Sequence, residues 1–164
     1  MDRSSEYVID KVWEEKTEDL QKEIINFWVD HGALQQEQAT ERVMQVFCVG
    51  RDKTGKIVGV GTVYPQFNHQ LENSFYYYRS FVAPDHRSNQ LATSLLNFTR
   101  NNLNEAFVQG VNTRCIGMLL EVENEMLKNY WNQAVWPYTD FIYIGKNNRG
   151  DHVRINYFDG ARIS

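Results

Sequence analysis

A short stretch in the middle of the chain constrains the fold more than any other feature. Residues 75–82 form an aromatic run typical of a strand, Pro84 marks a break, and a polar loop at 85–90 opens directly into an apolar pattern that predicts a helix. The first N–H groups of such a helix have no partner within it, and the positive end of the helix dipole lies behind them. The stretch therefore predicts a loop that binds a phosphate or another anion.

Patterns along the rest of the chain predict alternating strands and helices. A Thr17 cap followed by two acids predicts a helix to about Gly32, and Asn147–Asp151 predicts a hairpin turn. No domain boundary, repeat or low-complexity tract is visible, so we expect one domain over residues 1–164. Strands are expected at 7–13, 43–49, 56–64, 75–82, 116–123, 139–146 and 152–158, helices at 17–32, 34–43, 90–107 and 124–133, and a polar loop at 67–73.

Composition excludes several classes of protein. The 164 residues are 42% hydrophobic with a net charge of −4 and no basic run, which disfavours a nucleic-acid partner. No run of about 18 apolar residues predicts a membrane span, and the first residues lack the apolar core of a signal peptide, so we expect a cytoplasmic protein. The two cysteines lack CxxC spacing and the four histidines lack ligand spacing, which predicts no disulfide framework and no metal site.

The loop after Pro84 has the spacing of a known signature. It resembles the acyl-CoA-binding segment of the GNAT N-acyltransferases, Arg/Gln-x-x-Gly-x-Gly/Ala, with Arg87 and Ala92 at its ends and Gln90 where the central Gly stands. The predicted order, β-α-α-β-β-β-α-β-α-β-β, is similar to the GNAT order across essentially the whole chain. The resemblance implies an α/β fold with a central mixed sheet of about seven strands and helices on both faces.

The resemblance also implies a site for acetyl-CoA. The strand at 75–82 would part from the parallel strand at 116–123, and backbone groups of its last residues would pair with the pantetheine arm and the thioester oxygen. The pyrophosphate would lie on backbone N–H groups of the loop and helix start. The side chain of Gln90 narrows the space for the pyrophosphate, so we expect binding that is weaker but not abolished. A left-handed backbone at Asn89 would relieve part of this narrowing. The implied cofactor-binding residues are Phe81, Val82, Arg87, Ser88, Asn89, Gln90, Leu91, Ala92, Thr93 and Asn124.

A second family motif, Asn-x-x-Ala-x-x-Leu-Tyr-x-x-x-Gly-Phe, begins at Asn124. Its Tyr, which commonly protonates the departing thiolate, corresponds to Trp131, whose indole N–H is not a practical acid. Tyr130 lies one residue earlier, which turns it by about 100° on a helix. Two interpretations stay open: Tyr130 and Trp131 pack against the core and groove, or a shift of one residue brings Tyr130 to the sulfur as the catalytic acid.

The attacking amine must lose a proton to a base, usually a carboxylate near the parted strands. Glu121 and Glu123 share one face of the strand at 116–123, opposite its apolar residues. We favour Glu123 as the catalytic base because it lies closer to the strand end. The alternative is that both are solvated acids at the edge of the strand.

The function that the resemblance implies is transfer of an acetyl group from acetyl-CoA to a primary amine of a small molecule or peptide, by direct attack and without a metal. One alternative is a degenerate GNAT fold that binds CoA or a protein partner without turnover, which the departures at Gln90 and Trp131 favour. Another is an unrelated mixed α/β binding domain. Phe67, Trp136 and Tyr138 indicate an aromatic-lined acceptor groove, and a homodimer is left open.

Overall fold

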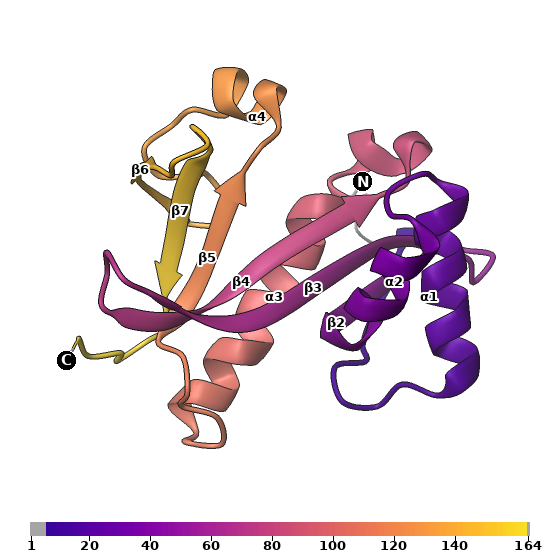
Figure 1. The fold of residues 1–164 in the computed structure, drawn as a ribbon, viewed down its shortest axis with the longest axis horizontal. Coiled ribbons are helices and arrows are strands. Elements are labelled where there is room, and N and C mark those ends of the chain that lie inside the picture. The colour runs from indigo at the N-terminus through magenta and orange to yellow at the C-terminus, as the bar shows by residue number, and fades with distance from the viewer. Residues whose placement is uncertain (1–5, 164) are drawn as a thin grey trace. The chain divides into compact units, whose positions relative to one another are not determined.

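The computed structural model describes residues 6–163, apart from the side chains of Ser88 and Asn89. Within these residues lie seven strands and four α-helices, in the order predicted from the patterns (Figure 1). The strands are β1 (Val8–Lys11), β2 (Val46–Arg51), β3 (Ile57–Asn68), β4 (Asn73–Val82), β5 (Gly117–Val122), β6 (Ile142–Lys146) and β7 (His152–Tyr157). The helices are α1 (Glu18–Asp30), α2 (Gln36–Arg42), α3 (Leu91–Val108) and α4 (Glu125–Tyr130), with 3-10 helices η2 (Val43–Gln45) and η3 (Pro84–Asn89).

The strands are hydrogen-bonded in the order β1-β2-β3-β4-β5-β7-β6. β4 and β5 pair in parallel at Tyr76↔Met118 and Tyr77↔Leu119, whereas β5 with β7, β6 with β7, β1 with β2 and β2 with β3 pair antiparallel. The predicted fold class, a mixed α/β sheet of seven strands, is therefore confirmed.

The chain divides into two compact units, each built from segments that are distant in the sequence. Unit 1 consists of Met1–Val63 and Arg79–Thr99, and unit 2 of Tyr64–Tyr78 and Arg100–Ser164. The chain passes from one unit to the other within β3, β4 and α3. We describe each unit by itself.

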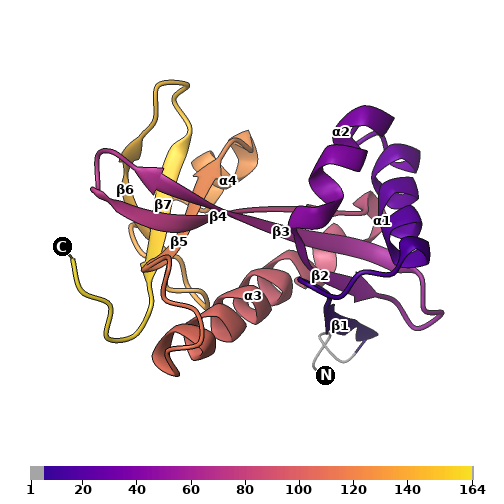
Figure 2. The same ribbon diagram turned by 60° about the horizontal axis from the view of Figure 1, so that its bottom comes forward.

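In unit 1, helices lie on both faces of the strands: α1 and α2 on one face and the first turns of α3 on the other (Figures 1 and 2). Helix α1 begins where its cap predicts, because the Thr17 hydroxyl accepts a hydrogen bond from the backbone N–H of Leu20 at 3.1 Å. Its apolar side, with Ile24, Phe27 and Trp28, is buried.

Helix α3 approaches β2 and β3 closely in unit 1. A Cβ atom at Gly59 would lie 3.0 Å from side-chain carbons of both Leu91 and Leu95, and one at Gly50 would lie 3.1 Å from Leu91. Glycine at these cross-strand partners lets the helix pack directly on the strands. The contact fixes the direction in which the start of α3 points.

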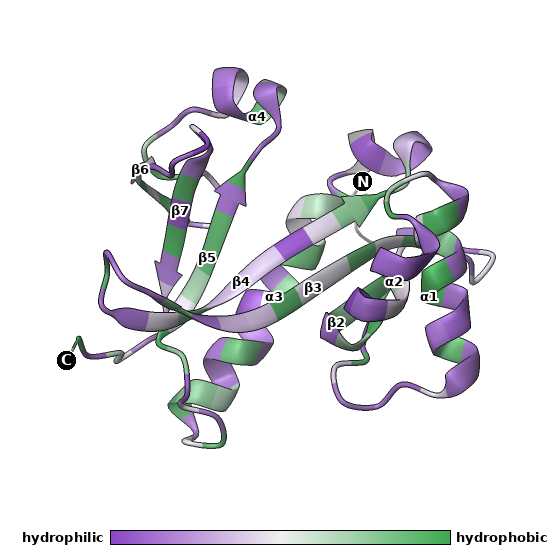
Figure 3. Ribbon diagram, viewed as in Figure 1, coloured by the Kyte–Doolittle hydropathy of each residue, from purple (hydrophilic) through white to green (hydrophobic). Residues whose placement is uncertain are grey.

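The core of unit 2 is formed by Phe75, Tyr77, Leu119 and Ile155, with Tyr64 packed against it. Figure 3 shows β5 as largely hydrophobic, with a hydrophilic band near its end. Strand β3 continues to Asn68 and β4 begins at Asn73, so the loop predicted over 67–73 exists but is confined to residues 69–72. Tyr64 extends the strand over this core, and the Asn68 side chain, bonded to Tyr77 and to the backbone N–H of Leu71, closes the turn.

Candidate functional site

The signature loop lies entirely in unit 1. Strand β4 ends at Val82, and Pro84 occupies the first turn of η3, where its missing N–H is not needed. The backbone N–H of Ala83 donates to the carbonyl of Val58 at 2.8 Å, which holds the end of the strand against β3. The break, the polar loop and the helix that follows are therefore arranged as the sequence predicts.

Gln90 is the residue on which the path of this loop depends. Its backbone is left-handed, with φ of 61° and ψ of 14°, and α3 begins at the next residue. This is the conformation for which glycine is usually required. Gln90 adopts it with its side chain exposed, so the side chain turns away from the protein. Asn89 instead ends η3, so the prediction that Asn89 relieves this position was wrong.

The first backbone N–H groups of α3 precede its hydrogen-bond ladder. Ser94 N–H donates to the Gln90 carbonyl at 3.0 Å, so the N–H groups of Leu91, Ala92 and Thr93 lie ahead of that bond. Leu91 is buried, Ala92 exposed and Thr93 half-buried, which anchors the turn on one side and opens it on the other. With the positive end of the helix dipole behind them, these N–H groups can bind a phosphate.

Arg87 lies against the end of β4. Its Nε donates to the Val82 carbonyl at 3.0 Å, and its guanidinium carbon is 5.4 Å from the centre of the Phe81 ring. Its two Nη groups have no hydrogen-bond partner within residues 6–163 and can donate to an anion. Phe81, Val82 and Arg87, which were predicted to bind the coenzyme, lie close together in unit 1. The side chains of Ser88 and Asn89 lie outside the described part.

Sequence reasoning missed one contact of this loop. His86 Nδ1 lies 2.9 Å from the Tyr7 hydroxyl, and the two rings meet edge to face with centres 5.6 Å apart. The contact ties η3 to the beginning of the chain. No sequence signal could reveal a pair that is 79 residues apart.

In unit 2, the two predicted carboxylates have different surroundings. Glu121 Oε2 accepts hydrogen bonds from Asn147 at 2.7 Å and Arg149 at 3.3 Å, in a network that also holds the buried Asp151. Hydrogen bonds from Asn147 and Arg149 lower the pKa of Asp151. Glu121 thus serves the hairpin turn. Glu123 is exposed and has no hydrogen bond or ion pair within the described part of the chain, which leaves its carboxylate available.

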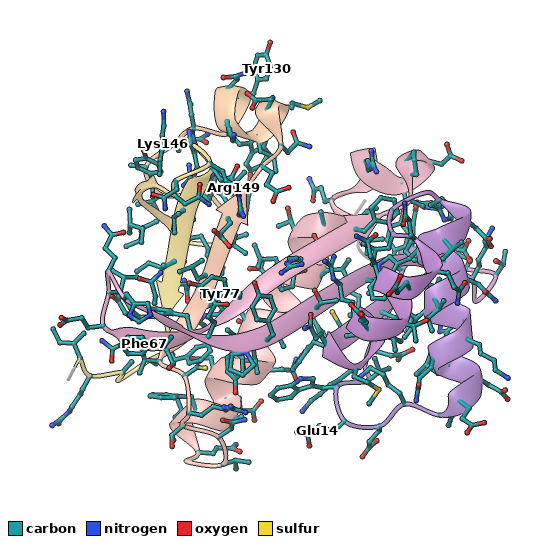
Figure 4. All side chains as sticks on the ribbon, viewed as in Figure 1. Glu14, Phe67, Tyr77, Tyr130, Lys146 and Arg149 are labelled. Carbon is teal, nitrogen blue, oxygen red and sulfur yellow. The ribbon has the colours of Figure 1, made fainter. Side chains whose placement is uncertain are left out.

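The second family motif maps onto α4. Asn124 caps this helix, since its Oδ1 accepts from the N–H groups of Met126 and Leu127 at 2.9 and 3.2 Å, and only its amide NH₂ remains for a ligand. Tyr130 is 78% exposed, and Figure 4 shows it pointing away from the strands of unit 2. Trp131, at the helix end, is 40% exposed. Of the interpretation that both side chains pack against the core and groove, the part that concerns the core is therefore wrong.

Trp136 does not line a surface groove. It is 8% exposed, and its Nε1 donates to the Trp131 carbonyl at 2.7 Å, so the expectation of a groove lined by Phe67, Trp136 and Tyr138 was wrong for Trp136. Among the residues that the structure describes, no three His, Cys, Asp or Glu side chains gather closely enough to hold a metal ion. In the same residues, no helix has the length and apolar composition to span a membrane.

Residues 8–133 match the model of the acetyltransferase (GNAT) family. The chain belongs to this family. No curated protein sequence matches it. The family match ends before β6 and β7, so it covers the signature loop and α4 but not the C-terminal hairpin.

Solved structures share the GNAT fold at low sequence identity. A GNAT-family acetyltransferase from Streptococcus pneumoniae is 11% identical, with a TM-score of 0.62 over 93% of this chain and 99% of the other. The ribosomal-protein-S5-alanine acetyltransferase from Vibrio fischeri is 12% identical, with a TM-score of 0.61 over 96% of both chains. AtaTR bound with acetyl-CoA is 13% identical, with a TM-score of 0.60 over 94% of both. These similarities support the GNAT fold, but they do not identify the acceptor.

Proposed function

We propose that the protein transfers an acetyl group from acetyl-CoA to a primary amine of a small molecule or peptide. The observation that carries the proposal is the left-handed backbone of Gln90 directly before α3. A side chain in this conformation costs about 1–2 kcal/mol, which the rest of the structure must offset. The chain thus keeps the backbone path of the GNAT signature although it lacks the glycine that would make the path free of strain.

In this proposal, unit 1 holds the coenzyme. The N–H groups of Leu91, Ala92 and Thr93 bind the diphosphate, and the Nη groups of Arg87 add charge-assisted hydrogen bonds. Phe81 and Val82 offer backbone groups to the pantetheine arm, since β4 continues beyond its last pair with β5 at Tyr77. The Val82 carbonyl keeps one lone pair for this purpose, because Arg87 uses the other.

The proposed reaction is a direct attack of the amine nitrogen on the thioester carbonyl. A C–N bond forms, the C–S bond breaks, the amine proton passes to a base, and the thiolate takes a proton from an acid or from water. We propose Glu123 as the base because Glu121 is engaged in the hairpin turn. Tyr130 is the proposed acid, and its exposure means that this role requires the substrate to reach it at the surface.

A second candidate function, binding of CoA without turnover, is favoured by Trp131 at the position of the family's Tyr. Release of free thiol from acetyl-CoA, measured over a panel of polyamines, aminoglycosides and peptide N-termini, separates the two functions. We expect thiol release with at least one acceptor. Binding of acetyl-CoA without thiol release for any acceptor would favour the second function.

Variants then test the proposed roles. We expect Glu123→Gln to lower kcat/KM by about 10²-fold or more, the typical contribution of a general base, whereas the exposed Glu41→Gln serves as a matched control with no effect. Tyr130→Phe should lower kcat and leave the KM for acetyl-CoA unchanged. If Tyr130→Phe leaves kcat unchanged, water or another group is the acid.

A further inference from the structure

Arg154, on β7 in unit 2, is a buried cation. It is 1% exposed, and it stands opposite Leu120 of β5 and Tyr143 of β6. Within residues 6–163 no carboxylate lies within ion-pair distance of it, and its Nε has no hydrogen-bond partner. Burial lowers the pKa of Arg154. Burial of a charge without an ion-pair partner costs free energy of folding, so the remaining contacts of Arg154 must offset that cost.

Apart from the Tyr143 ring, whose centre lies 5.9 Å from the guanidinium carbon, those contacts go to one neighbouring stretch of chain. Nη1 of Arg154 donates to the carbonyls of Ala134 and Phe141 at 3.5 Å, and Nη2 donates to the carbonyl of Trp131 at 3.4 Å. The guanidinium carbon lies 4.3 Å from the centre of the Trp136 ring, a cation–π distance. We call this stretch, Trp131–Phe141, the 131–141 segment.

The 131–141 segment is strained. Tyr138 and Asp140 have positive φ angles of 69° and 59°, although neither is glycine. Between them, the buried hydroxyl of Thr139 has no hydrogen-bond partner in the described part of the chain. Such conformations persist only where the surrounding structure enforces them, and they gather at binding and catalytic sites.

The same segment presents apolar side chains to solvent. Tyr138 is 81% exposed and Val135 is 51% exposed, beside the half-exposed Trp131. Backbone hydrogen bonds from Trp136 to the Phe141 carbonyl and from Asp140 to the Trp136 carbonyl, at 2.8 and 3.0 Å, give the segment one internal shape. Rigid aromatic side chains bind ligands at a low cost in conformational entropy.

We propose that Arg154 is a positioning residue that holds the 131–141 segment in its strained conformation, so that Trp131 and Tyr138 can bind the acceptor. This rests on the proposed function. A buried ion can often be replaced by an apolar side chain without loss of stability, so stability alone does not explain an arginine here. The planar guanidinium group explains why an arginine stands here, because it reaches three carbonyls and stacks on Trp136 at once.

The positioning role is tested by hydrogen exchange of the Trp136 indole N–H, assigned by the peak that Trp136→Phe removes. In Arg154→Met we expect this exchange to accelerate by about tenfold or more, because the variant loses the hydrogen bond from Nη2 that holds the Trp131 carbonyl. Arg154→Lys, which lacks the planar guanidinium group, should restore little of the protection. Arg162→Met, at an exposed arginine, is the matched control. Equal exchange in wild type and Arg154→Met at equal global stability would overturn the proposal.

The acceptor role is tested by steady-state kinetics with the best acceptor of the panel. Arg154→Met should raise the KM for the acceptor by about tenfold and leave the KM for acetyl-CoA unchanged. An unchanged acceptor KM would overturn it. If the wild-type protein shows no turnover, the proposed function fails and the acceptor role with it, whereas the exchange experiment still decides the positioning role. If Arg154→Met does not fold, Arg154→Lys supplies both measurements.

Discussion

The Tyr7 hydroxyl lies 2.9 Å from Nδ1 of His86, and this contact connects the start of the chain to the 3-10 helix that leads to Gln90. His86 is half-buried, so the hydrogen bond is partly shielded from water. The pair therefore supports the shape of the loop that we assign to the coenzyme.

Removing the Tyr7 hydroxyl should weaken the loop without changing its chemistry. A hydrogen bond of this kind contributes about 1 kcal/mol, so we expect Tyr7→Phe to raise the Kd for CoA by roughly threefold to fivefold. Isothermal titration calorimetry measures this. Tyr157→Phe, at a half-exposed ring in unit 2, is the control. An unchanged Kd in Tyr7→Phe would show that the contact does not support the loop.

Replacing Gln90 by glycine should relieve the strain at the start of α3. We expect Gln90→Gly to stabilise the protein by about 1 kcal/mol in urea unfolding and to tighten binding of CoA, because glycine adopts a positive φ without a steric penalty. Gln90→Ala shortens the side chain but keeps the backbone strain. It therefore separates the effect of side-chain size from the effect of the strain. A loss of stability together with unaltered affinity in Gln90→Gly would contradict our account of this residue.

Alkaline pH should destabilise unit 1 through Cys48. Burial raises the pKa of this thiol from an ordinary value of 9.0 to about 11. Between those pH values the folded protein keeps a proton that the unfolded chain releases, so stability falls as pH rises, by about 1.4 kcal/mol per pH unit. Urea unfolding at pH 8, 9 and 10 measures the slope.

The Cys48→Ala variant isolates this contribution. Lys16 acts in the opposite direction, because burial lowers its pKa from 10.5 to about 8 and stability therefore rises with pH between those values. Both proteins contain Lys16, so its effect cancels when they are compared. We expect a shallower alkaline loss of stability in Cys48→Ala, and equal slopes in the two proteins would refute the assignment.

Local patterns predicted the elements of the fold well. The Thr17 cap, the seven strands and the Asn147–Asp151 turn follow from side chains within a few residues of one another, and the structure contains them all. The break at Pro84 and the helix after it follow from the same kind of local chemistry.

Features that depend on distant contacts could not be predicted in this way. His152, Arg154 and Asn156 alternate along β7 like the solvent-facing side of a strand, yet Arg154 is buried because the 131–141 segment covers it. Trp136 was expected at the surface, but within this segment its ring is buried and faces the Arg154 guanidinium. The extension of β3 to Asn68 similarly goes with a contact to another strand, because the Asn68 amide donates to the Tyr77 hydroxyl of β4 at 3.1 Å.

The most direct test of the central claim is to follow the backbone amides of Leu91, Ala92 and Thr93 by NMR during titration with acetyl-CoA. We predict that these amides shift and gain protection from exchange. At about 100 times its Kd, acetyl-CoA should also stabilise the protein by roughly 2.7 kcal/mol. Acetyl-pantetheine, which lacks the diphosphate, should leave the three amides unmoved. Binding of acetyl-CoA that does not perturb these amides, or no binding at all, would contradict the account.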